Sequence, residues 1–196
     1  MNTRMNKLSV KRSMNYLRTR GFLPAHTINT AFRDAWQGLE KVKVSLELQT
    51  GSELAPQVRL WCDEEGEQSV ACRGARGGGI TLEAQVNRPG RWLGLHFALG
   101  NIDLSKVEML GFYAKSHALR ASSWRVCVRS GRSDGFVDHF FEKHAVSCAA
   151  PSVHMDMMEL AAQNRFPKGA TWRELVIFFH VESFNITLRD LRLFSV

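Results

Sequence analysis

The chain has 196 residues, 44% of them hydrophobic, including 12 Phe and 5 Trp, and its formal net charge is +7. This apolar content excludes an intrinsically disordered chain and can fill the core of one β-sandwich. The charge is unevenly spread. Seven of the 26 Lys and Arg residues precede Asp34, the first acidic residue, so the remaining 19 balance the 19 Asp and Glu.

The first 33 residues therefore form a basic arm, and we expect a sandwich domain to span residues 34–196. Apolar residues between the charges would allow a short helix from Ser9 to Gly21. The charges interrupt every apolar run that a secretory signal would need, and no stretch approaches the ~20 apolar residues of a membrane span. The cationic residues expected to bind a partner are Arg4, Lys7, Lys11, Arg12, Arg18 and Arg20.

A protein partner is the arm's expected target. Nucleic acid is a weaker alternative, and a solvated terminus with no partner is another.

Alternating apolar and polar residues predict a first strand from about residue 42 to 48. The residues from His154 to Gln163 are expected to form a short helix that covers a sheet edge. Because no helices alternate with the strands, the predicted fold is all-β, with two packed antiparallel sheets and that one short helix. The further strands are expected at 57–62, 69–73, 80–87, 91–99, 107–115, 123–130, 136–142, 173–181 and 186–194.

One face of these strands carries rings and cationic side chains. Leu93, Leu95 and Phe97 should point into the core, because successive strand residues face opposite sides of a sheet. Sugars lie on aromatic rings and need paired hydrogen-bond donors and acceptors, and an acidic polysaccharide would also use the guanidinium fork of arginine. The predicted ligand-binding residues are Trp92, His96, Tyr113, Lys115, Arg125, Arg129 and His139.

A purely structural role would also account for these residues. An outer sheet face is polar in any case, Trp92 could cover a sheet edge, and the two arginines could pair with surface carboxylates. We expect His180, in contrast, to be buried within a central strand.

Three fragments carry a resemblance to a known family: RWLGLHFALGNIDLSKVEMLGFYAKS, WRVCVRS with DHFFEKH, and TWRELVIFFHVESF leading into ITLRDLRLF. They resemble the jelly-roll sandwich of carbohydrate-binding modules, also called galactose-binding-domain-like. The resemblance covers about the C-terminal half of the chain and implies a noncatalytic protein whose concave sheet holds sugars. Such jelly rolls often hold a structural calcium, for which Asp138, Glu142 and Asp190 are candidate ligands.

The basic arm, in place of a secretion signal or a catalytic domain, suggests an adhesin, spike or fibre component of a phage or phage-like particle. Such a protein is made in the cytoplasm, joins a virion or larger oligomer, and attaches it to a host-cell polysaccharide. The alternative is a structural or decoration jelly roll that packs on other protein subunits and binds no glycan. The fold does not choose between them, because sandwiches serve both purposes.

Several kinds of chemistry find no support in the sequence. The cysteines lack Cys-x-x-Cys spacing, although Cys62 and Cys72 could pair across a hairpin that turns near Gly66. The glycine-rich residues 74–79 lack the Lys-Ser/Thr ending of a phosphate loop and are expected to form a turn. No metal-ligand spacing occurs, and no carboxylate pair suited to glycoside hydrolysis can be identified. We therefore expect no enzyme activity, no cofactor and no catalytic metal.

Overall fold

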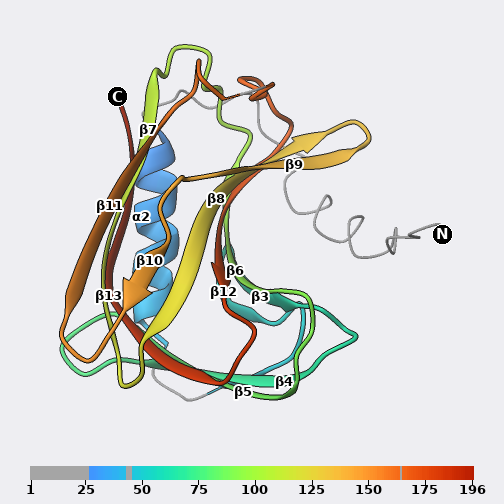
Figure 1. Cartoon of the computed structure of the whole chain (residues 1–196). Coiled ribbons are helices and arrows are strands. Elements are labelled where there is room, and N and C mark those ends of the chain that lie inside the picture. The colour runs from blue at the N-terminus through green and yellow to red at the C-terminus, as the bar shows by residue number, and fades with distance from the viewer. Residues whose placement is uncertain (1–26, 43–45, 164) are drawn as a thin grey trace.

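The computed structural model describes residues 27–42, 46–163 and 165–196 and shows two antiparallel sheets packed face to face with one helix beside them (Figure 1). The predicted all-β sandwich is confirmed. The arm cations from Arg4 to Arg20 and the helix expected between Ser9 and Gly21 lie outside the described residues. Among the residues described, no helix is long and apolar enough to cross a membrane.

The first sheet has six strands in the spatial order β1-β4-β5-β13-β7-β11. They are β1 (Leu46–Leu48), β4 (Glu67–Gly74), β5 (Ile80–Arg88), β13 (Phe184–Ser195), β7 (Met109–Ala118) and β11 (Ser152–Glu159). The second sheet has seven strands in the order β10-β8-β12-β6-β3-β2, with β9 paired to β8. They are β10 (Ala145–Ser147), β8 (Ser122–Arg132), β12 (Arg173–Phe179), β6 (Leu93–Gly100), β3 (Val58–Cys62), β2 (Glu53–Ala55) and β9 (Gly135–Phe140).

The core lies between the sheets and consists of the side chains that the alternation predicted to point inward. Leu93, Leu95 and Phe97 of β6 are fully buried, and Phe112 of β7 and Val126 of β8 meet them from both sheets. These inward predictions are therefore confirmed. They hold because burying apolar side chains is the main force that specifies the register of each strand.

The expected hairpin around Gly66 is wrong, because β3 and β4 belong to different sheets. Residues 63–66 form a turn, closed by a hydrogen bond from the Gly66 N–H to the Asp63 carbonyl, that carries the chain from one sheet to the other. Cys62 and Cys72 are consequently not cross-strand partners. Both are buried, and both are free thiols.

The helix expected at residues 154–163 is also wrong, because residues 152–159 form β11. Asp156 and Met158 are buried while Met155 and Met157 are exposed, which is the two-residue alternation of a strand. Methionine favours helices in isolation, but here pairing with β7 along the whole of β11 overrides that preference. His180 is exposed rather than buried, because β12 ends at Phe179, and its Nδ1 lies 3.8 Å from Glu182 Oε1.

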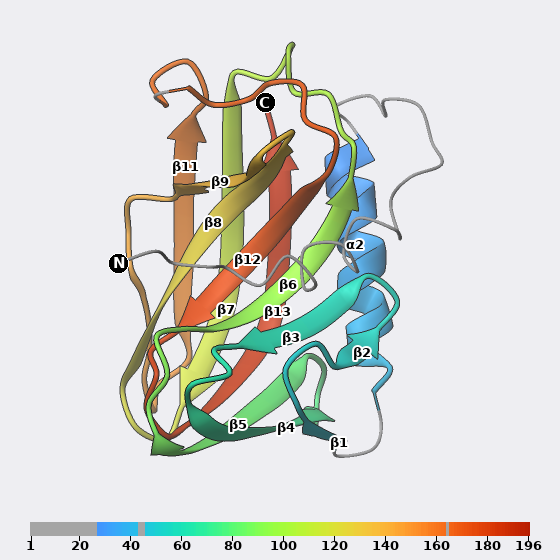
Figure 2. The same ribbon diagram turned by 90° about the vertical axis from the view of Figure 1, so that its right-hand side faces the viewer.

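The helix of the described chain is α2 (Thr27–Glu40), which the strand pattern did not predict. It lies along one open side of the sandwich, next to β13 and β6, as Figure 2 shows. Ile28 and Phe32 are buried in the core, and the Phe32 and Phe97 ring centroids are 5.0 Å apart. The expected boundary between residues 33 and 34 thus falls inside a helix that contributes to the core.

Candidate functional site

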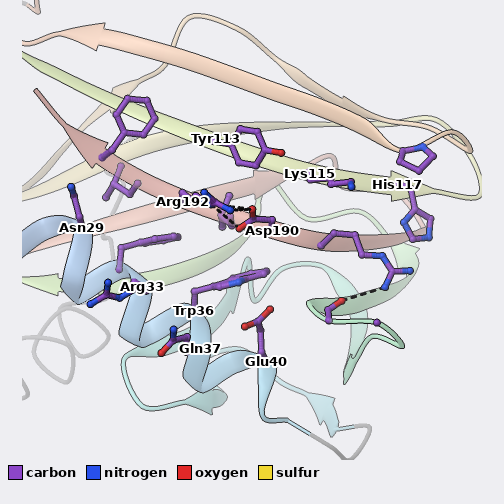
Figure 3. A pocket seen from close by; sticks show the side chains of 18 of the residues that line it. Asn29, Arg33, Trp36, Gln37, Glu40, Tyr113, Lys115, His117, Asp190 and Arg192 are labelled. Carbon is purple, nitrogen blue, oxygen red and sulfur yellow. Dashed lines mark hydrogen bonds and ion pairs between the residues drawn. The ribbon is translucent and has the colours of Figure 1, made fainter.

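An open groove of about 1310 Å³ lies between α2 and the outer face of β7 and β13 (Figure 3). Helix α2 forms one wall, and the outward side chains of β7 and β13 form the floor. Residues 76–78 and the loop before β11 form parts of the rim. The groove therefore gathers residues from five separate parts of the chain, which no single sequence motif could reveal.

The helical wall follows from the amphipathic pattern of α2. Its apolar side faces the sandwich core, and Trp36, on the border of that side, is almost fully buried yet still reaches the groove. Its polar side faces the groove and consists of Asn29, Arg33, Gln37 and Glu40, spaced three or four residues apart as one helix face requires.

Strand register arranges the floor and the neighbouring strand β11 in rows of outward side chains. Tyr113 lies between Met155 and Arg192 in the central row. The row on one side is Val153, Lys115 and Asp190, and the row on the other side is Met157, Gly111 and Phe194. An aromatic ring is thus surrounded by apolar groups on one flank and by hydrogen-bonding groups on the other.

Arg192 and Asp190 form an ion pair on this floor. Arg192 donates from its Nε at 3.0 Å and from a terminal nitrogen at 2.7 Å to Asp190 Oδ2. This hydrogen bond, with the adjacent negative charge, raises the pKa of Arg192. The guanidinium carbon lies 5.5 Å from the centre of the Tyr113 ring, so the cation also contacts the ring face.

A β-bulge in β13 shapes the end of the groove next to the rim. Leu188 pairs with Ser116 and Asp190 with Lys115, so Arg189 is an extra residue in the strand. Arg189 donates to the carbonyl oxygens of Arg76 and Gly78 and thereby holds the glycine-rich turn against the groove. Gly77, Gly78 and Gly79 all have positive φ angles, which only glycine adopts readily.

Comparison with solved structures identifies the fold, although no protein-family model and no curated protein matches the sequence. A CBM4 structure aligns with a TM-score of 0.52 and 10% identity over 82% of this chain and 98% of its own. The family 11 carbohydrate-binding module of the Clostridium thermocellum cellulase Lic26A-Cel5E aligns with a TM-score of 0.50 and 12% identity, over 80% and 97%. The fold is that of a carbohydrate-binding module.

On this carbohydrate-binding-module fold, the seven predicted ligand-binding residues do not form one surface. Tyr113 and Lys115 line the groove on the six-stranded sheet. His96, Arg125 and Arg129 point outward from the seven-stranded sheet, on the opposite side of the sandwich. The single decorated face expected from the sequence is wrong, because alternation assigns a side chain to an inner or outer face but not to a particular sheet. The remaining two predicted residues are Trp92, half-buried just before β6, and His139.

Two arginines on the outer face of the seven-stranded sheet contact side chains of β9. Arg129 donates two hydrogen bonds to Asp138, at 2.7 and 2.8 Å, and lies 3.9 Å from the centre of the Phe136 ring. Arg125 lies 4.1 Å from the centre of the Phe140 ring. The expected pairing with a surface carboxylate is therefore confirmed for Arg129, whereas Arg125 contacts an aromatic ring.

His96 and Glu174 form a buried pair on the same face. His96 Nδ1 lies 2.9 Å from Glu174 Oε2. Burial alone would raise the pKa of Glu174, but the hydrogen bond with His96 and the nearby positive charge of Arg129 outweigh it and lower that pKa. Both side chains are at most one-tenth exposed, so they stabilise the sheet rather than offer an open contact surface.

His139 is wrong as an outward residue. Its register opposite Val128 places it on the inner side of β9, because Val128 faces the core. The ring is buried, and its centroid lies 4.8 Å from that of Phe166. The candidate calcium ligands Asp138 and Asp190 do not lie together, because Asp138 is on β9 of the seven-stranded sheet and Asp190 is on β13 of the six-stranded sheet. Within the described residues, no three His, Cys, Asp or Glu side chains are grouped to hold a metal.

Two patterns in the sequence indicate groove residues that were not predicted. Residues 28, 32, 35, 36 and 39 are apolar at helical spacing, and this pattern predicts α2 with its polar wall. In β13 the inward residues Leu188 and Leu191 are three positions apart where alternation requires two, which indicates the bulge. If the alternation is restarted after that bulge, Arg192 and Phe194 are expected to point outward, on the same face as Tyr113.

Proposed function

We propose that this protein binds a polysaccharide in the groove between α2, β7 and β13 and leaves it chemically unchanged. The observation that carries the proposal is the half-buried Tyr113 ring on the groove floor, flanked by Lys115 and by the Arg192–Asp190 pair. A sugar can place its C–H face on such a ring and its hydroxyl groups against such donors and acceptors. The fold shared with carbohydrate-binding modules supports this assignment.

The hydrogen bonds of the two carboxylates that line the groove support binding without catalysis. Glycoside hydrolysis needs two carboxyl groups that flank the bond to be cleaved and are able to transfer protons or attack it. Here Asp190 is held by Arg192, and Glu40 Oε1 accepts the N–H of Gly79 at 3.1 Å. Both carboxylates therefore already accept hydrogen bonds from groups of this chain.

A second candidate function is packing against another protein subunit. The observation that favours it is a strip of exposed apolar side chains on β11, formed by Val153, Met155 and Met157. Exposed apolar strips of this kind mark contact surfaces in many proteins. The strip borders Tyr113, so the same face could carry either a glycan or a subunit.

We extend the first proposal to the particle in which the protein would act. The basic arm, with Arg4 to Arg20, would attach the domain to a larger particle, in the way an adhesin or spike of a phage-like particle is attached, and the groove would bind a host-cell polysaccharide. This placement rests on the charge distribution of the sequence and stays a prediction.

A glycan array probed with the whole chain and its variants tests the function. We expect binding to at least one polysaccharide that Tyr113→Ala weakens tenfold or more and that Tyr113→Phe largely keeps, because the ring supplies the stacking surface. Phe136→Ala is the matched control, since Phe136 is a half-buried ring on the opposite sheet. If Phe136→Ala abolishes binding and Tyr113→Ala does not, the site lies on the seven-stranded sheet. If no glycan binds and the protein self-associates through β11, the packing function replaces this one.

A further inference from the structure

The groove carries an excess of positive charge. Its lining contains five cationic side chains but only two carboxylates, Glu40 and Asp190. The cationic residues are Arg33, Arg76, Lys115, Arg189 and Arg192. Because residues 34–196 carry equal numbers of acidic residues and of Lys and Arg, this local excess is not simply the average of the domain.

Two of the five cations have a carboxylate partner close by. Arg192 is hydrogen-bonded to Asp190, and Arg33 Nε lies 3.9 Å from Asp34. Glu40, the other groove carboxylate, accepts a hydrogen bond from a backbone N–H group, which carries no full charge. Within the described part of the chain, Arg76, Lys115 and Arg189 form no ion pair.

The surroundings of Arg189 and Lys115 leave their charge available to a ligand. Arg189 donates to two backbone carbonyls, which position its guanidinium but do not neutralise it. Lys115 is exposed and lies two residues from Tyr113 on the same face of β7, about 7 Å along the strand. A concave surface lined mainly by one sign of charge attracts ligands of the opposite sign.

We propose that the groove selects an acidic polysaccharide, with a sugar ring on Tyr113 and the carboxylate of a uronic acid residue at Lys115 and Arg189. This inference rests on the proposed function, because it names the class of polysaccharide that the same groove would bind. A neutral glycan would use the ring and the hydroxyl contacts but would leave these three cations without a negatively charged partner. An acidic glycan supplies the missing negative charge at a regular spacing along its chain.

The test compares matched polymers on the whole chain by isothermal titration calorimetry. The probes are polygalacturonate, alginate and hyaluronan, each beside its carboxyl-reduced form, with dextran sulfate beside dextran as a measure of charge alone. We expect at least one carboxylated polymer to bind ten times or more tighter than its reduced form. We expect that affinity to fall as salt rises, because exposed charges are screened over about 8 Å at physiological ionic strength.

Lysine variants test which positive charge binds the carboxylated polymer. Lys115→Ala should weaken binding of the carboxylated polymer about tenfold, and Lys115→Glu should weaken it more. Lys106→Ala is the control, because Lys106 is an exposed lysine in the loop between β6 and β7 and does not line the groove. It removes the same charge from the molecule and should leave the affinity unchanged.

Each contrary result has a defined meaning. Tyr113-dependent binding of neutral glycans with no gain from carboxylates overturns the acidic selectivity and leaves the proposed function standing. Equal binding of dextran sulfate shows that charge density alone is recognised, which also overturns it. If none of these polymers and no array glycan binds in a Tyr113-dependent way, the proposed function fails and this inference fails with it.

Discussion

The ring of Phe194 on β13 lies over Gly111 on β7, where a β-carbon would overlap the ring. Any larger residue at position 111 must therefore displace Phe194 from the groove floor. The cost in stability should be small, because the obstacle is the far end of a side chain that can rotate away. Residue 111 thus controls the shape of the floor without forming part of the apolar core.

Gly111→Ala should accordingly lower polysaccharide affinity about three- to tenfold, with a loss of unfolding free energy of roughly 1 kcal/mol. Calorimetric titration with a glycan identified on the array measures the affinity, and thermal unfolding measures the stability. Gly169→Ala is the control, because an added β-carbon there meets no atom within 4 Å. An unchanged affinity for Gly111→Ala would exclude Phe194 from the binding surface.

Helix α2 should prove to be an integral part of the domain. Phe32→Ala removes a ring that is 1% exposed and packed on Phe97, so it should cost about 3 to 5 kcal/mol of unfolding free energy. Arg33→Ala, at the next position and exposed, should cost less than about 0.5 kcal/mol. Urea denaturation compares the two variants. Equal stabilities would mean that the helix contributes little to the core.

Truncation should separate the arm from the domain at residue 26, not at residue 33. A chain starting at Thr27 keeps Ile28 and Phe32 and should retain the thermal midpoint and the glycan affinity of the whole chain. A chain starting at Asp34 loses both buried side chains and should unfold or aggregate. Thermal unfolding and the glycan array test both truncations. A folded chain from residue 34 would show that the first half of α2 is dispensable.

The buried Arg173 should be one of the most sensitive positions in the sandwich. Its guanidinium donates to the carbonyl oxygens of Ile102, Pro167 and Lys168, at 2.5 to 2.9 Å, and to the Ser130 hydroxyl. Arg173→Met fills similar space but removes the donor from the Ile102 and Pro167 carbonyls and from Ser130, at about 1 to 3 kcal/mol for each buried group. The Lys168 carbonyl keeps its hydrogen bond from the Leu104 N–H. We expect the variant to lose at least ~3 kcal/mol in chemical denaturation, whereas a loss below about 1 kcal/mol would contradict this role.

Stability should depend on pH through Asp63. Hydrogen bonds from the Arg91 side chain and from backbone N–H groups outweigh burial and lower the pKa of Asp63 to about 2. Because its folded-state pKa is below the ordinary value of 3.8, the carboxylate stabilises the fold fully above about pH 4 and loses this effect as pH falls towards 2.

Asp63→Asn should therefore be less stable than the natural chain at pH 7 by roughly 1 to 2 kcal/mol, since Arg91 is largely exposed and its charge is screened. The difference should shrink as pH falls from about 4 to 2. Denaturation curves at pH 7, 4 and 2.5 measure it. A difference that stays constant across these pH values would show that the ionised carboxylate contributes nothing.

Local alternation in the sequence was enough to predict the sandwich and most of its strands. Leu95, Phe112 and Val126 each lie in a strand that alternates apolar and polar residues, and the apolar face of such a strand must be buried. Their burial could therefore be predicted from the sequence alone. The same rule failed at β11. There Met155, Met157 and Met158 favour a helix locally, and only the long pairing with β7 makes the segment a strand.

The sequence by itself determined the uneven charge and the outward positions of Tyr113 and Lys115. Only the tertiary structure decided that His96, Arg125 and Arg129 lie on the other sheet, and that α2 stands beside Tyr113 to form a groove. The physical reason is that alternation encodes the direction of a side chain relative to its own strand. The choice of sheet depends on pairing between segments far apart in the chain, such as β7 with β13, which leaves no local pattern.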